Sequence, residues 1–431
     1  MRSVNLQDLY KNGSSWVLAT LLTHKYLLKR KKSNELFDQL PSNLCYEKKS
    51  RIKNLFYGVL RNQSRISDAL KPITKKTPKN LLLSILFTSG YELIESNNNK
   101  KEKIIHHAVE ESKRLVSPSE VKFLNAILRR LPSQLASQSE SKSLSIFYSH
   151  PEWLVENWVT AHGHDATKAL LKWNQSIPSI YLYNRAMPNE LEGKLMAMGN
   201  HFYRLANSNL NDPEIKALLE NGSTYIKDPA TSHSVTALNP KEGEKILDLC
   251  AAPGGKTFDC IQRMNHKGLI VAVDLPGKRM DRLNENLQQY KNENLLLEFL
   301  ACDVCSLSKS FFEKQQLPTQ YDAVLLDAPC SNTGVIQRKP DVRWRLQKKD
   351  LEQCADLQLK LLKSASKRVR AGGRIVYSTC SIESVENDFV IKQFLESESG
   401  NGFTLTHSNT YYPWIHKHDG AGVFLMSKAK T

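Results

Sequence analysis

The sequence lacks the features of membrane-spanning and secreted proteins. The apolar run Leu81–Phe87 is too short to cross a bilayer, and the polar start Met1–Gly13 does not resemble a secretory signal. Eight cysteines spread over 431 residues do not form the dense framework of a disulfide-stapled domain. The sequence also has no internal repeat of fixed period. These absences favour a cytoplasmic protein with reduced thiols, long enough for two or three domains.

Acidic residues are scarce in the N-terminal third. The whole chain has 60 Lys and Arg against 44 Asp and Glu, a formal net charge of +16. Residues 1–130 hold 25 basic and 11 acidic residues, whereas the other 301 hold 35 and 33. A basic region joined to a nearly neutral body is typical of a nucleic-acid-binding module attached to a second domain.

Residues 1–135 are predicted to form a helical domain. Apolar residues recur at helical spacing, as in Ile52, Leu55, Phe56 and Val59. Ser117–Glu120 has the composition of a helix start, with Pro118 in the first turn. The serine-rich stretch 132–145 indicates a linker, and residues 146–240 mix helical and strand-like patterns, which predicts a small α+β connector.

Residues 241–431 alternate between strand and helix patterns. Five apolar strands are predicted at 245–249, 269–273, 295–301, 321–326 and 374–377, with a long helix at 350–370 ended by Gly372 and Gly373. This alternation predicts an α/β domain with a mostly parallel, doubly wound sheet. Polar residues follow the strand ends and should converge on one rim, where such sheets bind ligands: Asp274, Asp303, Asp327, Cys330 and Cys380.

The turn after the first of these strands indicates a nucleoside-containing cofactor. The turn Asp248–Lys256 does not fit the G-x-G-x-x-G dinucleotide pattern, which argues against a nicotinamide oxidoreductase. Gly254 and Gly255 still allow close approach of the backbone to a ligand. Asp274, at the end of the next strand, is placed to accept hydrogen bonds from a ribose diol.

Cys330 and Cys380 are candidates for thiol chemistry. A single cysteine is usually a small apolar packing residue, but two at neighbouring strand ends, facing one glycine-rich turn, favour a reactive pair. Lys256 or a helix N-terminus would promote thiolate formation. The spacing of Cys302 and Cys305 is interpreted as chance, because no second ligand pair for a metal is evident.

A basic loop with a tryptophan follows Cys330. In the stretch 339–345, Trp344 lies between Arg343 and Arg345, a pattern that suits contact with a base or a phosphate backbone. The alternative is that Trp344 packs against its own loop, and the sequence leaves both interpretations open.

Three motifs resemble those of the RNA cytosine-5 methyltransferase family. They are DLCAAPGGKT at 248–257, DAPCSNTGVI at 327–336 and YSTCSIESVEN at 377–387. The N-terminal region, with FYGVLR at 56–61 and KFLNAILRRL at 122–131, is similar to the NusB-type RNA-binding domain. The resemblance implies a class I, Rossmann-like S-adenosylmethionine-dependent methyltransferase domain behind an all-α NusB-like domain. The last predicted strand, Asp419–Phe424, differs from the family's Gly-Phe-Phe element.

The resemblance also implies roles for individual residues. Cys380 is expected to be the nucleophile that adds to carbon 6 of cytosine, and Cys330 to assist release of the product. Asp327 is expected to hydrogen-bond the base, and Lys256 is a candidate for lowering a thiol pKa. The implied cofactor-binding residues are Cys250, Ala251, Ala252, Pro253, Gly254, Gly255, Lys256, Asp274, Asp303 and Asp327.

The two resemblances together imply a monomeric enzyme that methylates small-subunit (16S) ribosomal RNA, with no metal and no membrane partner. The family's target is a cytosine at position 967 in standard bacterial numbering, in free or early-assembly rRNA. The alternatives are the same chemistry on tRNA or another RNA, or an RNA-binding assembly factor with a relic site.

Overall fold

The computed structural model describes residues 13–184, 191, 193–206, 210, 212–220 and 224–430. Most of the polar start Met1–Gly13 therefore lies outside the described residues. The chain divides into two compact units, one formed by residues 1–176 and 336–346 and the other by 177–335 and 347–431. The boundary at 176 falls within the stretch 146–240 that the sequence assigns to a connector, and the domain limits given above stay predictions.

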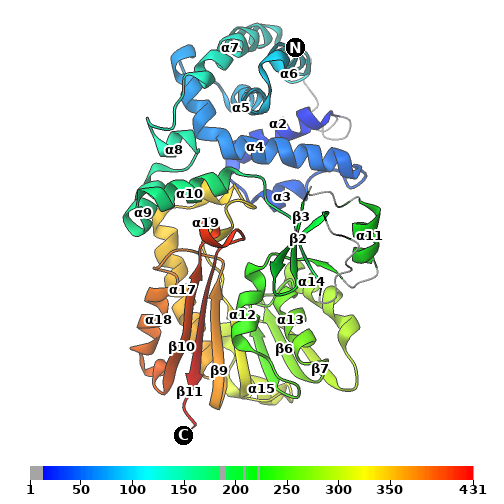
Figure 1. Ribbon diagram of the computed structural model, residues 1–431, viewed down its shortest axis with the longest axis vertical. Coiled ribbons are helices and arrows are strands. Elements are labelled where there is room, and N and C mark those ends of the chain that lie inside the picture. The colour runs from blue at the N-terminus through cyan, green and yellow to red at the C-terminus, as the bar shows by residue number, and fades with distance from the viewer. Residues whose placement is uncertain are drawn as a thin grey trace. The chain divides into compact units, whose positions relative to one another are not determined.

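The first unit is helical, as its apolar periodicity predicts (Figure 1). Its helices are α2 (Ser15–Lys29), α3 (Ser33–Phe37), α4 (Tyr46–Leu70), α5 (Asn80–Glu95), α6 (Lys101–Ser112), α7 (Pro118–Ala136), α8 (Leu144–Phe147), α9 (Glu152–His162), α10 (His164–Gln175) and α16 (Val342–Arg345). Apolar stripes of α2, α4, α5 and α7 form its core. Ser117 caps α7 in a capping box with Glu120, and Pro118 occupies the first turn.

Helix α7 continues past Pro132, so the linker predicted from residue 132 begins later than expected. The helix ends at Ala136, and its apolar stripe extends through the buried residues Leu131 and Leu135. A proline inside a helix costs about 3 kcal/mol. Burying two leucines at roughly 1.5–3 kcal/mol each offsets that cost.

The segment 336–346 leaves the second unit and packs into the first. The Arg343 guanidinium is fully buried and donates to the carbonyl oxygens of Ser149 and Asn174, at 3.2 and 3.0 Å. Trp344 Nε1 donates to the carbonyl oxygen of Leu60 at 2.7 Å, and its ring packs against the helical core. Burial lowers the pKa of Arg343. The structure therefore favours packing for Trp344, and Arg343 is not available to a phosphate.

The second unit contains a seven-stranded sheet in the order β10-β11-β9-β8-β5-β6-β7 and a four-stranded antiparallel sheet in the order β2-β3-β1-β4. The strands are β1 (Tyr181–Tyr183), β2 (Leu195–Gly199), β3 (Phe202–Leu205), β4 (Tyr225–Ile226), β5 (Lys245–Leu249), β6 (Gly268–Asp274), β7 (Leu295–Ala301), β8 (Tyr321–Asp327), β9 (Val369–Thr379), β10 (Phe403–Tyr411) and β11 (Ala421–Lys428). Strands β9, β8, β5, β6 and β7 are parallel, whereas β11 runs antiparallel to β9 and β10.

Helices cover both faces of the larger sheet (Figure 1). Those of the second unit are α11 (Pro213–Glu220), α12 (Ala230–Leu238), α13 (Gly255–Arg263), α14 (Lys278–Leu287), α15 (Lys309–Lys314), α17 (Lys348–Ser366), α18 (Asp388–Leu395) and α19 (Pro413–His416). One core contains apolar residues of α17 and α18, and the other those of α12, α13 and α14. The doubly wound α/β prediction is thus confirmed, and its switch point lies between β5 and β8. None of the described helices is both long and apolar enough to cross a membrane.

The prediction of a helix over 350–370 was wrong at its end. Helix α17 stops at Ser366, and Gly372 and Gly373 lie inside strand β9. Tyr321 pairs with Val369, but Ala323 already pairs with Arg374, so the strand bulges around the two glycines. A Cβ on Gly373 would lie 2.9 Å from the carbonyl oxygen of Asp322. The glycines therefore mark a bulge, not a helix end.

Candidate active site

The turn after β5 has a backbone that only some residues can adopt. Gly254 has a φ of +102°, and a Cβ there would lie 2.9 Å from Leu287 Cδ1. The peptide before Pro253 is cis. Helix α13 begins at Gly255, so its first N–H groups lie at the carboxyl edge of the sheet. This geometry brings the backbone close to whatever occupies the rim.

Asp274, at the end of β6, supports this turn. One carboxylate oxygen accepts the Ala252 N–H at 2.9 Å, and the other accepts the Leu275 N–H at 2.8 Å. Arg279 lies 3.7 Å from the same carboxylate, which is largely buried. Each carboxylate oxygen can accept a further hydrogen bond, so Asp274 keeps the capacity to bind a diol.

Asp303 follows the edge strand β7 and is exposed. Its Oδ1 accepts the Cys305 N–H at 2.8 Å, which caps a short 3₁₀ turn at Val304–Ser306. Burial raises the pKa values of Cys302 and Cys305, and no group of metal-ligating side chains is found among the described residues. Asp303 thus faces solvent at the rim of the sheet.

Lys256 and Asp327 form a partly buried ion pair at the switch point. Lys256 Nζ lies 2.6 Å from Asp327 Oδ2, and the Ser378 hydroxyl donates to Asp327 Oδ1 at 3.0 Å. Burial alone would lower the pKa of Lys256, but the Asp327 carboxylate raises it more, so its pKa is raised overall. Lys256 therefore stays a cation at neutral pH.

Asp248 lies behind this pair and is fully buried. The Thr257 hydroxyl donates to its Oδ2 at 2.6 Å, whereas its Oδ1 has no partner among the described atoms. Burial raises the pKa of Asp248 to about 7, although the Thr257 hydrogen bond opposes the shift. The site thus combines one partly buried cation with one buried carboxyl group that holds its proton unusually well.

The two cysteines predicted to be reactive are neighbours. Cys330 follows β8, Cys380 follows β9, and their Sγ atoms are 3.2 Å apart. The Cys380 thiol also lies 3.3 Å from Asn332 Oδ1, and the Asn332 amide donates to the Cys330 carbonyl oxygen at 2.7 Å. The hydrogen bond with Cys380 and burial raise the pKa of Cys330. The Cys330 thiol therefore retains its proton at neutral pH.

Lys256 and Cys380 line one small cavity of about 50 Å³. Ala230, Thr231 and Ser234 of helix α12 line it too, together with the loop before β11. The cavity thus places a cation, a thiol and hydroxyl groups around one space at the carboxyl edge of the sheet.

A buried carboxylate ties the two cysteine loops together. Glu386 accepts hydrogen bonds from the Ser331 N–H at 2.9 Å and from the Ser381 hydroxyl at 2.6 Å. Gln358 of α17 donates to the same carboxylate at 2.8 Å and to the Pro329 carbonyl oxygen at 2.9 Å. Ser331 and Ser381 each follow a cysteine directly, so this network fixes the separation of the two sulfur atoms.

Gly334 and Gly420 allow a third loop to pack against the two cysteine loops. The Gly334 N–H donates to the Cys380 carbonyl oxygen at 3.0 Å, and the Gly420 N–H donates to the Gly334 carbonyl oxygen at 2.8 Å. A Cβ on Gly334 would lie 2.8 Å from the Gly420 Cα and 2.9 Å from the Cys380 oxygen. The segment before β11, where the sequence departs from the family that it resembles, thus packs against the cysteine loops.

The structure separates the predicted site residues into groups. Lys256, Asp327, Cys330 and Cys380 meet around the β8 and β9 ends, and Ala251, Ala252, Pro253, Gly254, Gly255 and Asp274 form the turn beside them. Cys250 has a φ of +58° and packs against the core, and burial raises its pKa beyond any acid–base use. Of Cys250, therefore, only the backbone contributes to the turn after β5.

Sequence reasoning missed the supporting polar residues. Glu386, Gln358, Asn332 and the two serines were not identified as candidates, although Glu386 lies within the motif at 377–387. A possible signal was an acidic residue close to a predicted reactive cysteine, but its burial and its partners on three other segments depend on the fold.

Known proteins resemble this chain along most of its length. The 16S rRNA methyltransferase RsmB/F family matches residues 235–418, and the NusB family matches residues 17–132. The "Probable ribosomal RNA small subunit methyltransferase B" of Bacillus subtilis is 30% identical over 414 residues, which cover 92% of this chain and 88% of the relative. A ribosomal RNA small subunit methyltransferase B from Shewanella oneidensis is also 30% identical, over 80% of this chain and 81% of its own.

Solved structures share the fold. The crystal structure of PH0851 superposes with a TM-score of 0.73 at 22% identity and covers 96% of this chain and 99% of its own. NSun6 from Pyrococcus horikoshii, solved with SFG, has a TM-score of 0.54 at 19% identity, over 65% of this chain and 99% of its own.

Proposed function

The chain belongs to the 16S rRNA methyltransferase RsmB/F family, and we propose that it methylates carbon 5 of one cytosine through a covalent bond to Cys380. It is an S-adenosylmethionine-dependent rRNA methyltransferase with a NusB-type helical domain. The observation that carries the proposal is the 3.2 Å separation of Cys330 and Cys380 beside the Lys256–Asp327 ion pair.

The residues present fit a nucleoside cofactor with a sulfonium group. We propose that Asp274 accepts the ribose hydroxyls, that Asp303 faces the base, and that the turn 250–256 lies against the remainder of the cofactor. The close approach enforced by Gly254 and the unpartnered Oδ1 of Asp248 support this fit. When bound, the cofactor supplies an electrophilic methyl group.

Cys380 is proposed to act as the nucleophile. Carbon 5 of cytosine is a poor nucleophile until the aromatic ring is broken, and addition of a thiolate to carbon 6 breaks it. The electron pair of the sulfur forms the S–C6 bond, and electron density moves to carbon 5, which then takes the methyl group. The cation of Lys256 in the same cavity favours the thiolate form of Cys380.

Cys330 is proposed to assist the release of the product. After methyl transfer, carbon 5 must lose its proton before the Cys380 sulfur can leave with its bonding electrons. Cys330 lies beside the adduct, with its Sγ 3.2 Å from that of Cys380. We propose that it assists the elimination in which the carbon-5 proton passes to solvent, the C5–H electrons form the C5=C6 double bond, and the S–C6 bond breaks.

Asp327 is proposed to hydrogen-bond the cytosine ring. Its carboxylate is held by Lys256 and by the Ser378 hydroxyl, so it has a fixed orientation at the end of β8. A carboxylate fixed in this way can accept a hydrogen bond from the exocyclic amino group of cytosine and so orient the ring for addition at carbon 6.

The target is proposed to be the cytosine at position 967 of 16S rRNA in standard bacterial numbering, in the free or early-assembly state. The base must leave its stack, which costs a few kcal/mol and is least costly in unpaired RNA. The excess of basic residues in 1–130 supports salt-dependent binding to the RNA backbone, which offsets that cost. We propose that the enzyme acts as a monomer in the cytoplasm, where its rRNA substrate is made.

Bisulfite sequencing of RNA from cells with and without the gene tests this function. We expect the loss of one 5-methylcytosine from 16S rRNA and its return when the gene is restored. Restoration with the Cys380→Ala variant should fail. Loss of a mark in tRNA would reassign the substrate, and unchanged marks in all RNA would favour an assembly factor with a relic site.

A further inference from the structure

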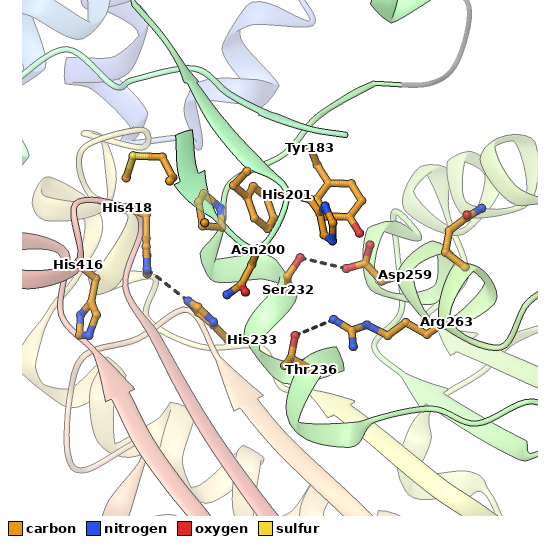
Figure 2. Close-up of a pocket in the computed structure, with 15 residues that line it drawn as sticks. Tyr183, Asn200, His201, Ser232, His233, Thr236, Asp259, Arg263, His416 and His418 are labelled. Atoms are coloured by element: carbon orange, nitrogen blue, oxygen red, sulfur yellow. Dashed lines mark hydrogen bonds between the residues drawn. The ribbon is translucent and has the colours of Figure 1, made fainter. Parts of the chain in front are cut away.

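A second and larger cavity lies in the same unit as the cysteines. Its volume is about 470 Å³, and it is lined by residues of the β2–β3 hairpin, α12, α13 and α19 (Figure 2). Its side chains include Tyr183, Asn200, His201, His233 and Arg263. Cys330, Cys380, Lys256 and Asp327 are not among its lining residues. The chemistry assigned above therefore does not use this cavity.

Helix α12 lies between the two cavities. Ala230, Thr231 and Ser234 line the small one, whereas His233 and Thr236 line the large one. A helix with its side chains is about 10 Å across. A few nucleotides of an unstacked RNA strand can cover that distance, so a strand with its target base at Cys380 can reach the second cavity.

Ring faces line this cavity. Tyr183 lies 5.1 Å from the Phe202 ring and 6.2 Å from the His201 ring, measured between centroids. The His233 ring stacks on Tyr411 at 3.8 Å with an interplanar angle of 5°. Aromatic and imidazole faces stack on unpaired bases, and such stacking tolerates any base.

Polar ring edges and amides supply hydrogen-bonding groups. His233 Nε2 and His418 Nε2 are 3.2 Å apart (Figure 2), and burial lowers the pKa of His233 to about 4 and also lowers that of His418. Both imidazoles are therefore neutral at neutral pH. His418 Nδ1 contacts the Asp419 carbonyl oxygen at 2.7 Å and its Nε2 contacts His233, so the imidazole nitrogen that faces a ligand is His233 Nδ1. A neutral imidazole nitrogen and the Asn200 amide suit the edge of a base better than a phosphate.

Arg263 is a cation of the lining that can attract the phosphate backbone of RNA. Its guanidinium donates one N–H to the Thr236 hydroxyl at 2.8 Å and carries further N–H donors in the same plane. Asp259 is the acidic residue of the lining, but it forms a buried ion pair with Lys227. The cavity therefore carries a net positive charge at its α13 side.

We propose that this cavity binds an unpaired nucleotide of the substrate RNA that flanks the target cytosine. The base stacks against the rings around Tyr183 and His201, and the phosphate lies beside Arg263. The inference rests on the proposed function, because it assumes that RNA reaches Cys380. No group of metal-ligating side chains occurs among the described residues, so the imidazoles do not indicate a metal site.

Photo-crosslinking tests where the RNA lies without requiring catalysis. The full chain is irradiated with 16S rRNA fragments around position 967, each with 4-thiouridine at one position flanking the target. We expect one flanking position to crosslink to peptides containing Tyr183, 198–202 or 229–236. Crosslinks confined to other peptides would overturn the proposal. Crosslinks here without methyl transfer to any RNA would retain the cavity's role and reject the proposed function.

Abasic RNA gives the quantitative test. Removing the flanking base should lower kcat/KM of the native enzyme roughly tenfold through lost stacking. His201→Ala, at the exposed hairpin turn, should cause a similar loss on intact RNA and little further loss on abasic RNA. Arg263→Gln should raise KM on both RNAs and leave kcat unchanged, whereas Arg282→Gln, on the exposed side of α14, should change neither. Equal abasic penalties in the native and His201→Ala enzymes would contradict the proposal.

Discussion

The two cavities on either side of α12 differ in how their polar groups are held. Around Cys380, an ion pair, two thiols and a buried carboxylate are cross-linked by hydrogen bonds from four segments of the chain. Around His233, stacked and tilted rings form much of the lining, beside the Lys227–Asp259 pair and the Arg263–Thr236 hydrogen bond. Bond formation requires fixed distances between reacting atoms, whereas base stacking tolerates small displacements. The contrast suits a reaction on one side and RNA positioning on the other.

The largest effect should come from removing the nucleophile on the first side. Cys380→Ala should lower methyl transfer by at least about 10³-fold, because it removes the thiol proposed to add to carbon 6. The assay is transfer of labelled methyl to 16S rRNA fragments. The variant should still bind cofactor and unfold at the native temperature, so that the loss is chemical. Activity within tenfold of the native enzyme would refute the assignment.

The two lysine–carboxylate pairs of this unit give a matched comparison. Lys256→Met should lower kcat by about 10- to 100-fold, since it removes the cation beside the thiol. The acidic limb of the pH–rate profile should move to higher pH, because the thiolate then forms less readily. Lys227→Met breaks the pair with Asp259 on the second side and should leave the pH profile unchanged. Identical pH–rate profiles for the two variants would show that Lys256 does not act on the thiol in a way that Lys227 does not.

The network that holds the cysteine loops should matter next. Glu386→Gln replaces an acceptor of several hydrogen bonds by a group with two donors, which leaves a donor of Ser331 or Ser381 unpaired. We expect a loss of about 1–3 kcal/mol of stability and a roughly tenfold lower kcat with KM unchanged. Gln358→Leu is the control that removes one donor and keeps the carboxylate. A Glu386→Gln enzyme with native kcat would show that the network does not set the separation of the thiols.

The smallest effect is a change in the pH dependence of stability. The pKa of Asp248 is about 7 in the folded protein, above its ordinary value, so the folded state holds the proton more tightly than the unfolded state. Its stabilising contribution is present below about pH 4 and is lost as the pH rises through 7. The Tm of Asp248→Asn relative to the native enzyme should therefore rise between pH 5 and pH 7.5. A constant Tm difference over that range would contradict the raised pKa.

The strand-end residues were predictable because their placement follows from chain direction. In a parallel sheet every strand ends at the same edge, so Asp274, Asp327, Cys330 and Cys380 had to converge. The apolar runs also gave β5 and β7 with the bounds that the structure shows. Local apolar pattern and topology were sufficient for these features.

Other features depend on contacts between distant segments. The bulge at Gly372–Gly373 needs the neighbouring strand β8, and the continuation of α7 past Pro132 needs the core that buries Leu135. Trp344 looked suited to RNA, but its indole donates to a carbonyl nearly 300 residues earlier. The second cavity combines rings from 183, 201, 233 and 418, a combination that no local pattern reveals.

Mass spectrometry of a trapped adduct tests the central claim most directly. The Cys330→Ala enzyme is incubated with 16S rRNA fragment and cofactor, denatured, digested and searched for a peptide linked to cytosine. We predict a denaturant-resistant complex in which the base is bound to Cys380 Sγ, because bond formation proceeds but release is slowed. A linkage at any other residue, or no covalent complex from a variant that still binds RNA and cofactor, would contradict the account.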